Sequence, residues 1–233
     1  MKSGIVHRIK NKIRLIKAKQ NVSHGKNHNE AWSQKEAQNF WRSGVNKEEE
    51  NLPTAYANLP FNQERGSYFL QKLEKLNLLK DDPILELGPN SGFILSFLNK
   101  NGFHNLTGIE INPDAIKTMK EYFPNLYENS TIINDSFENA LPQIPNNSFV
   151  LVYSMGAIMH VPAESNFIFE NIARISKKYI ISVEGENMLS SRHYPRDYKK
   201  IYENLGFKQI FFEMTEGNVD EWANLHFRIF QKN

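Results

Sequence analysis

The chain has 233 residues, of which 40% are hydrophobic and 23% are charged, and its formal net charge is +2. This composition is typical of one large globular domain with an extension, and the small net charge gives no general attraction to nucleic acid. The absence of cysteine excludes disulfides and thiolate metal sites and fits a reducing compartment. No apolar run approaches the ~20 residues of a membrane span and no signal peptide is visible, so we expect a cytoplasmic protein. The histidines show no H-x-H or H-E-x-x-H spacing, and we expect no metal site.

The first twenty residues concentrate basic charge. They contain seven lysines and arginines and no acid, and Ile5, Ile9, Ile13 and Ile16 recur at helical spacing. Basic amphipathic helices lie on anionic lipid, which predicts peripheral contact with the inner membrane face through residues 1–20. A frayed tail or a helix docked on its own domain explains the same pattern, and both alternatives stay open.

Residues 21–63 are polar but carry scattered aromatic side chains, namely Trp32, Phe40, Trp41, Tyr56 and Phe61. Aromatic side chains are stabilised by burial, so this segment is more than a linker. It either caps the core or forms a lid over a site. We therefore divide the chain into an N-terminal extension (1–63) and a domain (64–233).

From residue 64 onward, helical and strand patterns alternate. Helices are predicted over 65–79, 92–102, 112–123, 163–176 and 195–206. Strands are predicted over 83–87, 105–111, 130–135, 148–155, 178–185, 208–214 and 224–232. This alternation predicts an α/β fold with a doubly wound, seven-stranded, mostly parallel sheet. The last two strands have no helix between them and should pair antiparallel at one edge.

The stretch "LELGPNSG" (85–92) ends the first predicted strand, and ligands bind at this edge of such sheets. Gly88 and Gly92 permit a tight turn into the next helix. A dinucleotide-binding loop would read G-x-G-x-x-G, but here Asn90 replaces the middle glycine and Glu86 adds a negative charge. Glu110 ends the second strand, where a carboxylate can accept both hydroxyls of a ribose. The pattern favours a nucleoside that carries positive charge, such as S-adenosylmethionine.

These stretches resemble the motifs of the class I, Rossmann-like S-adenosylmethionine-dependent methyltransferases, over roughly residues 64–232. "ILELGPNSG" is similar to the first motif and "LTGIEINPDAI" to the second, which implies that Glu110 holds the ribose and Ile111 flanks the adenine. "INDSFEN" is similar to the third, which implies that Asp135 accepts from the adenine amino group and that the Ser136 backbone meets the ring. "NSFVLVYSMGAIMHVP" is similar to the fourth, which lines the site between sulfonium and acceptor. The predicted cofactor-binding residues are Glu86, Gly88, Asn90, Gly92, Glu110, Ile111, Asp135, Ser136 and Met155.

Two histidines are candidates for proton transfer. His160 lies just past the fourth strand, at the mouth of the predicted site, and would take a proton if the acceptor is a hydroxyl. His193 is the second candidate. The alternative for His160 is a packed histidine that helps to start the next helix.

The loop "SSRHYPRDY" (190–198) follows the fifth strand and should face the same site. Arg192 and Arg196 can bind a carboxylate or phosphate, Tyr194 can stack on a sugar, and Tyr56 can close over the acceptor. The alternative is a solvated loop that caps the following helix.

These observations predict O-methylation of a small polar or saccharide acceptor, and the resemblance extends loosely to methyltransferases encoded with glycan assembly enzymes. A nicotinamide-dependent reductase and a non-catalytic module that binds a nucleoside or a partner remain alternatives. Nucleic acid is not the expected partner, because the chain has no N-P-P-Y motif and no broad basic face in the domain. The oligomeric state is left open.

Overall fold

The structure is a computed structural model that describes residues 31–43, 52–58, 62–215 and 225–233. The basic segment 1–20, for which we predict membrane contact, lies outside these ranges, as does Phe61. One compact unit of the chain runs from Ala31 to Asn233. The division at residue 63 stays a prediction. In the described ranges we find no helix long and apolar enough to cross a membrane.

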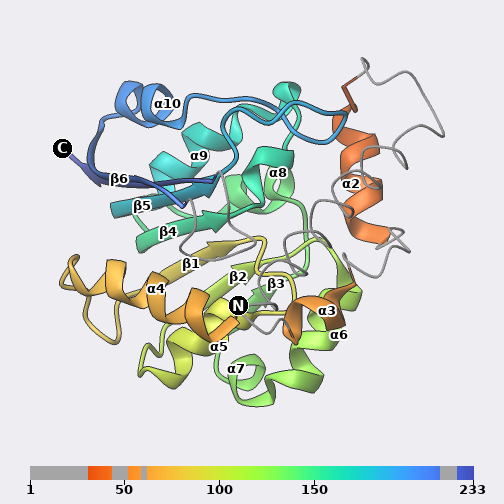
Figure 1. Cartoon of the computed structure of the whole chain (residues 1–233), viewed down its shortest axis with the longest axis vertical. Coiled ribbons are helices and arrows are strands. Elements are labelled where there is room, and N and C mark those ends of the chain that lie inside the picture. The colour runs from red at the N-terminus through yellow and green to blue at the C-terminus, as the bar shows by residue number, and fades with distance from the viewer. Residues whose placement is uncertain (1–30, 44–51, 59–61, 216–224) are drawn as a thin grey trace, which may run out of the picture. The chain divides into compact units, whose positions relative to one another are not determined.

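A seven-stranded sheet organises the described chain, with strand order β3-β2-β1-β4-β5-β7-β6 (Figure 1). The strands are β1 (Ile84–Leu87), β2 (Leu106–Ile109), β3 (Thr131–Ile133), β4 (Phe149–Met155), β5 (Ser176–Glu184), β6 (Phe207–Met214) and β7 (His226–Lys232). The first five strands pair in parallel, whereas β7 runs antiparallel to both β5 and β6. The predicted fold class is therefore confirmed, including the antiparallel pair at one edge. The last strand of the chain lies between β5 and β6, so β6 is the outer strand.

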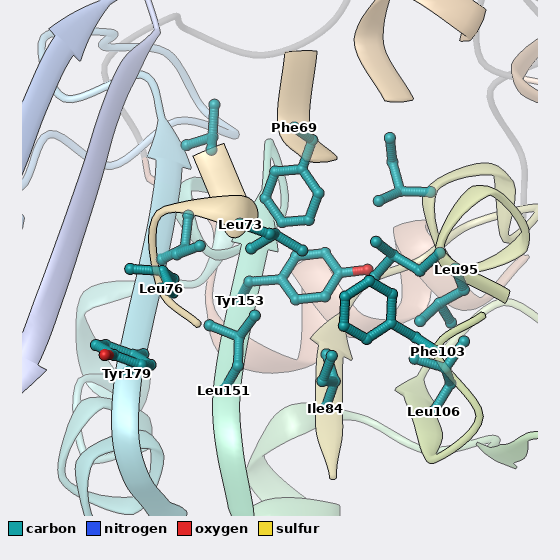
Figure 2. Packing of buried hydrophobic residues seen from close by; sticks show 14 of the residues in the cluster. Phe69, Leu73, Leu76, Ile84, Leu95, Phe103, Leu106, Leu151, Tyr153 and Tyr179 are labelled. Atoms are coloured by element: carbon teal, nitrogen blue, oxygen red, sulfur yellow. The ribbon is translucent and has the colours of Figure 1, made fainter. Parts of the chain in front are cut away.

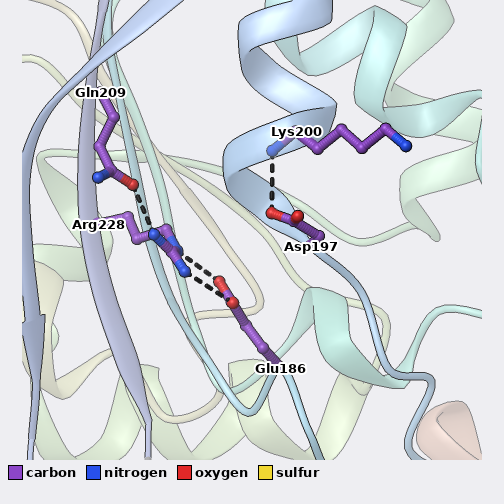
Figure 3. Close-up of polar contacts among 5 residues, drawn as sticks. All are labelled: Glu186, Asp197, Lys200, Gln209 and Arg228. Atoms are coloured by element: carbon purple, nitrogen blue, oxygen red, sulfur yellow. Dashed lines mark hydrogen bonds and ion pairs between the residues drawn. The ribbon is translucent and has the colours of Figure 1, made fainter.

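Nine α-helices are described in the resolved ranges: α2 (Gln34–Ser43), α3 (Pro53–Ala57), α4 (Asn62–Glu74), α5 (Phe93–Lys100), α6 (Pro113–Tyr122), α7 (Pro124–Glu128), α8 (Phe137–Ala140), α9 (Ile168–Ile175) and α10 (Tyr198–Asn204). Helix α6 begins as the sequence predicts, because the Asn112 side chain accepts from the Asp114 N–H at 2.9 Å and Pro113 occupies the first turn. Helix α10 begins later than predicted. Asp197 caps it by accepting from the Lys200 N–H at 3.0 Å (Figure 3).

Both faces of the sheet are covered. Helices α4 and α5 pack on one face, and α9 and α10 on the other (Figure 1). On the α4 face, the ring of Tyr153 lies 4.8 Å from that of Phe69, among aliphatic side chains from β1, α5 and β4 (Figure 2). Tyr153 is fully buried, and its hydroxyl donates to Glu86 Oε2 at 2.8 Å. The hydrophobic core therefore contacts Glu86, the carboxylate that precedes the glycine loop.

Candidate functional site

A cavity of about 250 Å³ opens at the carboxyl ends of β1, β2 and β4. The sheet order reverses between β1 and β4, which is the place where ligands bind in doubly wound sheets. Strands β1 and β4 point toward the side of the molecule on which α2 and α3 lie (Figure 1). Residues from α2, α3 and α4 line the cavity together with the strand ends.

The glycine loop forms the floor of this cavity. Gly88 has a φ of +73°, and a Cβ built on it would lie 2.6 Å from the Ala157 Cβ. Gly92 has a φ of +80° and precedes α5. Gly88 and Asn90 line the cavity, whereas Gly92 shapes the turn from outside the described lining. Position 88 thus favours glycine for two reasons, namely its left-handed backbone conformation and the close approach of Ala157.

Glu86 is a buried carboxylate in the cavity wall, with 4% of its surface exposed. Burial raises its pKa to about 8, although the hydrogen bond from the Tyr153 hydroxyl opposes this shift. In the ligand-free protein near pH 7, its protonated form is therefore favoured. A cation placed beside it would favour ionisation.

Glu110 connects the glycine loop to the next helix. Its Oε2 accepts from the Asn90 N–H and its Oε1 accepts from the Asn112 N–H, both at 2.8 Å. Burial raises the pKa of Glu110, and these backbone hydrogen bonds oppose the rise. Glu110 and Ile111 both line the cavity. The carboxylate is held in one orientation before any ligand arrives.

The segment after β3 contributes Ser136, which lines the cavity together with Phe137 and Glu138. Asp135 lies beside them but outside the described lining. Its carboxylate accepts from the Ser136 N–H at 2.7 Å and from the Asn139 amide at 3.1 Å. In this structure it supports the start of α8.

His160 lines the same cavity as Glu86 and Glu110. Its Nδ1 is 2.8 Å from the Arg192 carbonyl oxygen, and its ring lies between Trp41 at 4.5 Å and His193 at 4.7 Å. A carbonyl only accepts, so Nδ1 carries the proton and Nε2 of the neutral ring keeps its lone pair. Burial lowers the pKa of His160 to about 3. The ring is neutral near pH 7 and can accept a hydrogen bond.

The loop 190–198 stands behind this wall. The Arg192 guanidinium lies 5.1 Å from the Phe40 ring centre, and the Tyr194 hydroxyl donates to the Trp32 carbonyl at 2.9 Å. Arg196 donates to the Val161 carbonyl at 2.5 Å and to Asn166 Oδ1 at 2.9 Å.

Among the described residues, Arg192, Tyr194, Arg196 and His193 are absent from the cavity lining, which does include Tyr56 and Met155. His193 Nδ1 lies 2.7 Å from Ser190 Oγ instead. The loop therefore fastens α2 and the segment after β4 to the domain.

Sequence reasoning missed several polar side chains that line the cavity. Asn62 and Arg65 lie three positions apart on α4, and both are buried. Gln38 of α2 donates to Glu138 Oε2 at 3.0 Å. The helix predicted over 65–79 begins at Arg65 and leaves Asn62 out, so no signal in the sequence joined these two residues.

Comparisons with known proteins agree with this geometry. Residues 84–179 match the family model of a methyltransferase domain. The structure of magnesium protoporphyrin IX methyltransferase from Synechocystis with bound S-adenosylmethionine superposes with a TM-score of 0.67 at 13% identity, covering 88% of this chain and 100% of that one. A complex of the Haloferax volcanii Trm112 methyltransferase activator gives 0.57 at 14% identity, covering 77% and 96%.

One curated relative is EEF1A lysine methyltransferase 2 of Mus musculus, which is 35% identical over 57 residues. That match spans 24% of this chain and 23% of the relative's length, so it bears on the domain and not on the relative's whole activity. The solved structures support the fold, and the family model covers the segment from β1 into β5, which carries the glycine loop, Glu110 and His160. The matched domain and the shared fold agree: residues 84–179 match a methyltransferase domain, and the chain has the fold of solved methyltransferase structures.

Proposed function

We propose that this chain transfers a methyl group from S-adenosylmethionine to a hydroxyl group of a small polar or saccharide acceptor. The observation that carries the proposal is one cavity that is lined both by buried carboxylates and by a neutral histidine. The carboxylates suit a cationic nucleoside, and the histidine suits a group that must be oriented and must lose a proton.

S-adenosylmethionine supplies a methyl group on a sulfonium centre, an electrophile that needs alignment more than activation. Glu110 would accept the ribose hydroxyls, and Ile111 and Ser136 would lie beside the base; that all three line the cavity supports these roles. Glu86 lies where a negative charge would favour the cofactor's cationic groups. Glycine at position 88 lets the Ala157 side chain approach the loop closely. Whether Asp135 reaches the adenine stays a prediction.

The acceptor would lie between His160 and the aromatic side chains of the N-terminal helices. Phe40, Trp41 and Tyr56 line this part of the cavity and can exclude water from it. In the transfer, the acceptor oxygen forms a bond to the methyl carbon as the carbon–sulfur bond breaks. The hydroxyl proton goes to His160 Nε2. Aromatic faces and the Glu138 carboxylate support a polyhydroxyl acceptor more directly than the loop arginines do.

An amine acceptor is the second candidate, because the curated relative is named as a lysine methyltransferase. The exclusion of nucleic acid, contact of residues 1–20 with anionic membrane, and cytoplasmic location also remain proposals. A nicotinamide-dependent reductase would differ from a methyltransferase in the cofactor that it binds. A non-catalytic module would differ by the absence of turnover.

Two experiments test the proposal in sequence. Calorimetry with S-adenosylmethionine, S-adenosylhomocysteine and NADPH should detect binding of the first two alone. Methyl-labelled cofactor is then offered with saccharides, small hydroxy acids, a lysine-containing protein and tRNA. Label in a saccharide or small hydroxyl compound supports the proposal. Label confined to protein or tRNA overturns the acceptor class, and binding of NADPH without S-adenosylmethionine overturns the activity.

A further inference from the structure

Glu184 is a buried carboxylate at the end of β5 that the proposed chemistry does not use. It is fully buried, and its described partners all belong to the end of β4 or to the segment that follows, which we call the post-β4 turn (156–160). Its Oε1 accepts from Ser154 Oγ at 2.5 Å and from the Ala157 N–H at 3.4 Å. Its Oε2 accepts from the Met159 N–H at 3.1 Å.

We infer that Glu184 is a positioning residue for the acceptor side of the cavity: its carboxylate holds the post-β4 turn by its backbone and thereby sets where His160 lies. The inference rests on the proposed function only in assigning that wall to the acceptor. The turn carries Gly156, Ala157 and His160, which all line the cavity. A short 3₁₀ helix from Ile158 to His160 places the imidazole one residue beyond the amide that Glu184 binds.

Further contacts join the post-β4 turn to the chain after β5. The Gly156 N–H donates to the Val183 carbonyl at 2.9 Å, and the Tyr194 N–H donates to the Met159 carbonyl at 3.0 Å. His160 itself contacts the Arg192 carbonyl. Glu184 adds to these contacts, because its two carboxylate oxygens accept hydrogen bonds from backbone N–H groups of the same turn.

A neighbouring acid shows the difference in role. Glu186 is also buried, but both of its oxygens accept from the Arg228 guanidinium, at 2.6 and 2.8 Å (Figure 3). Gln209 completes the set by accepting from the same guanidinium at 2.6 Å. The Glu186 side chain therefore binds β7, whereas Glu184 two positions earlier binds the turn that lines the cavity.

The surroundings of Glu184 make this wall sensitive to pH. Burial raises the pKa of Glu184 to about 7, while the bonds from Ser154, Met159 and Ala157 oppose the rise. The titratable groups that interact with it from α10 are Tyr198 and Tyr202, and Arg196 in the preceding loop acts on both tyrosines. Burial keeps both tyrosine pKa values above the ordinary value, so both stay neutral. Below about pH 7, protonation puts an O–H against backbone N–H groups, and the turn should loosen.

The test follows the turn directly and needs no acceptor. We compare the full-length wild-type chain with Glu184→Gln, Glu184→Ala and the control Ser182→Ala. Ser182 lies on the same face of β5 and is equally buried, and its Oγ has no hydrogen-bond partner among the residues described. Amide hydrogen exchange is measured at Met159. Imidazole ¹⁵N signals of His160, assigned with His160→Gln, are followed from pH 5.5 to 8.5.

We expect the wild-type His160 signals to shift with a midpoint near 7, even though the ring itself stays neutral in this range. The midpoint should vanish in Glu184→Gln, which keeps one acceptor oxygen and cannot ionise. In Glu184→Ala, exchange at Met159 should accelerate about tenfold or more, as in local opening. Gln should restore most of this protection, and Ser182→Ala should match the wild type.

Three outcomes would overturn the inference: a midpoint that persists in Glu184→Gln, unchanged exchange in Glu184→Ala, or an equal effect of Ser182→Ala. Calorimetry with S-adenosylhomocysteine runs alongside. Affinity should stay within about twofold in every variant, because the carboxylates of the cofactor side are untouched. Absence of binding in the wild type would instead count against the proposed function and would leave the exchange and NMR results standing.

Discussion

The two sides of the cavity are built in different ways. The side proposed for the cofactor comes from three short stretches, 86–91, 110–112 and 136–138, each of which lies at the end of a parallel strand or shortly after it. The acceptor side combines α2 and α3 with the post-β4 turn, and the loop 190–198 fastens it from behind. One side is therefore local in sequence, whereas the other depends on contacts between distant segments.

Because of this difference, we expect Glu110 to be held by residues of its own motifs and His160 to be held by contacts with distant segments. Glu110 bonds to two backbone amides of the glycine loop and of the segment before α6, so the cofactor side holds its shape with its own motif residues. His160 is held by a carbonyl of another loop and by the ring of Trp41. Substitutions should accordingly affect cofactor affinity on one side and turnover on the other.

The largest expected effect is on turnover. Replacing His160 by Gln removes the lone pair that takes the acceptor's proton and should lower kcat about 10²–10⁴-fold with the acceptor found in the labelling screen. S-adenosylmethionine affinity should hold, because His160 is not among the residues that we expect to bind the cofactor. His193→Gln serves as the control, and we expect kcat within about threefold of wild type. Full turnover in the His160 variant would reduce that residue to a packing role.

The second effect is on cofactor affinity. Glu110→Ala should weaken S-adenosylmethionine binding by about 1–3 kcal/mol, the scale of a lost hydrogen bond to a charged group. Asp135→Ala is the informative companion, since the Asp135 carboxylate already serves Ser136 and Asn139. Calorimetry on both gives a direct comparison. An equal loss supports adenine contact by Asp135, and unchanged affinity in Glu110→Ala would rule out its ribose role.

The third effect is a pH dependence of binding. Because burial raises the pKa of Glu86 to about 8, the ligand-free protein holds a proton there that a cationic ligand should displace. Affinity should rise with pH by at most about tenfold per unit and level off above about pH 8. Calorimetry in buffers of different ionisation enthalpy should show proton release, which Glu86→Gln should abolish. Binding without proton release near pH 7 would place the cation elsewhere.

The same group affects stability in a defined direction. The folded-state pKa of Glu86 lies above its ordinary value of 4.5, so the folded chain binds more protons between about pH 4.5 and 8. Its contribution to the free energy of unfolding should therefore fall as pH rises through this window. Denaturant titrations of wild type and Glu86→Gln should differ in this slope.

The smallest effect is expected for Arg192. Its guanidinium contacts Phe40 from behind the cavity wall, so Arg192→Ala should change the acceptor's KM less than about threefold. A rise of tenfold or more, with kcat unchanged, would return Arg192 to the acceptor-binding role predicted from sequence. That outcome would mean that the loop 190–198 turns inward when the acceptor binds.

The sequence predicted which residues gather at the strand ends because that information is local, and their role in cofactor binding stays a prediction. Strand ends of a parallel sheet meet at one edge, so Glu86 and Glu110 could be placed together without knowing the rest of the fold. No comparable rule predicts which way the side chains of a loop point. Tyr194 and Arg196 have side chains suited to binding a sugar or an anion, yet their hydrogen bonds go to Trp32, Val161 and Asn166. The burial of Glu184 depends on the pairing of β5 with β4 and β7, and the hydrophobic pattern of the sequence does not specify which strands pair.

The close approach of Gly88 to Ala157 has a consequence for how this enzyme could change its acceptor. A methyl group at position 88 would lie 2.6 Å from the Ala157 Cβ, so neither position can enlarge alone. The segment that lines the side proposed for the acceptor is thus in contact, at Ala157, with a turn in which Gly88 has a positive φ. Variation that alters specificity is expected to accumulate at Phe40, Trp41 and Tyr56, whose helices can be remodelled without touching the glycine loop. Because of the contact between them, Gly88 and Ala157 are expected to change only together, whereas the three aromatic positions can vary independently.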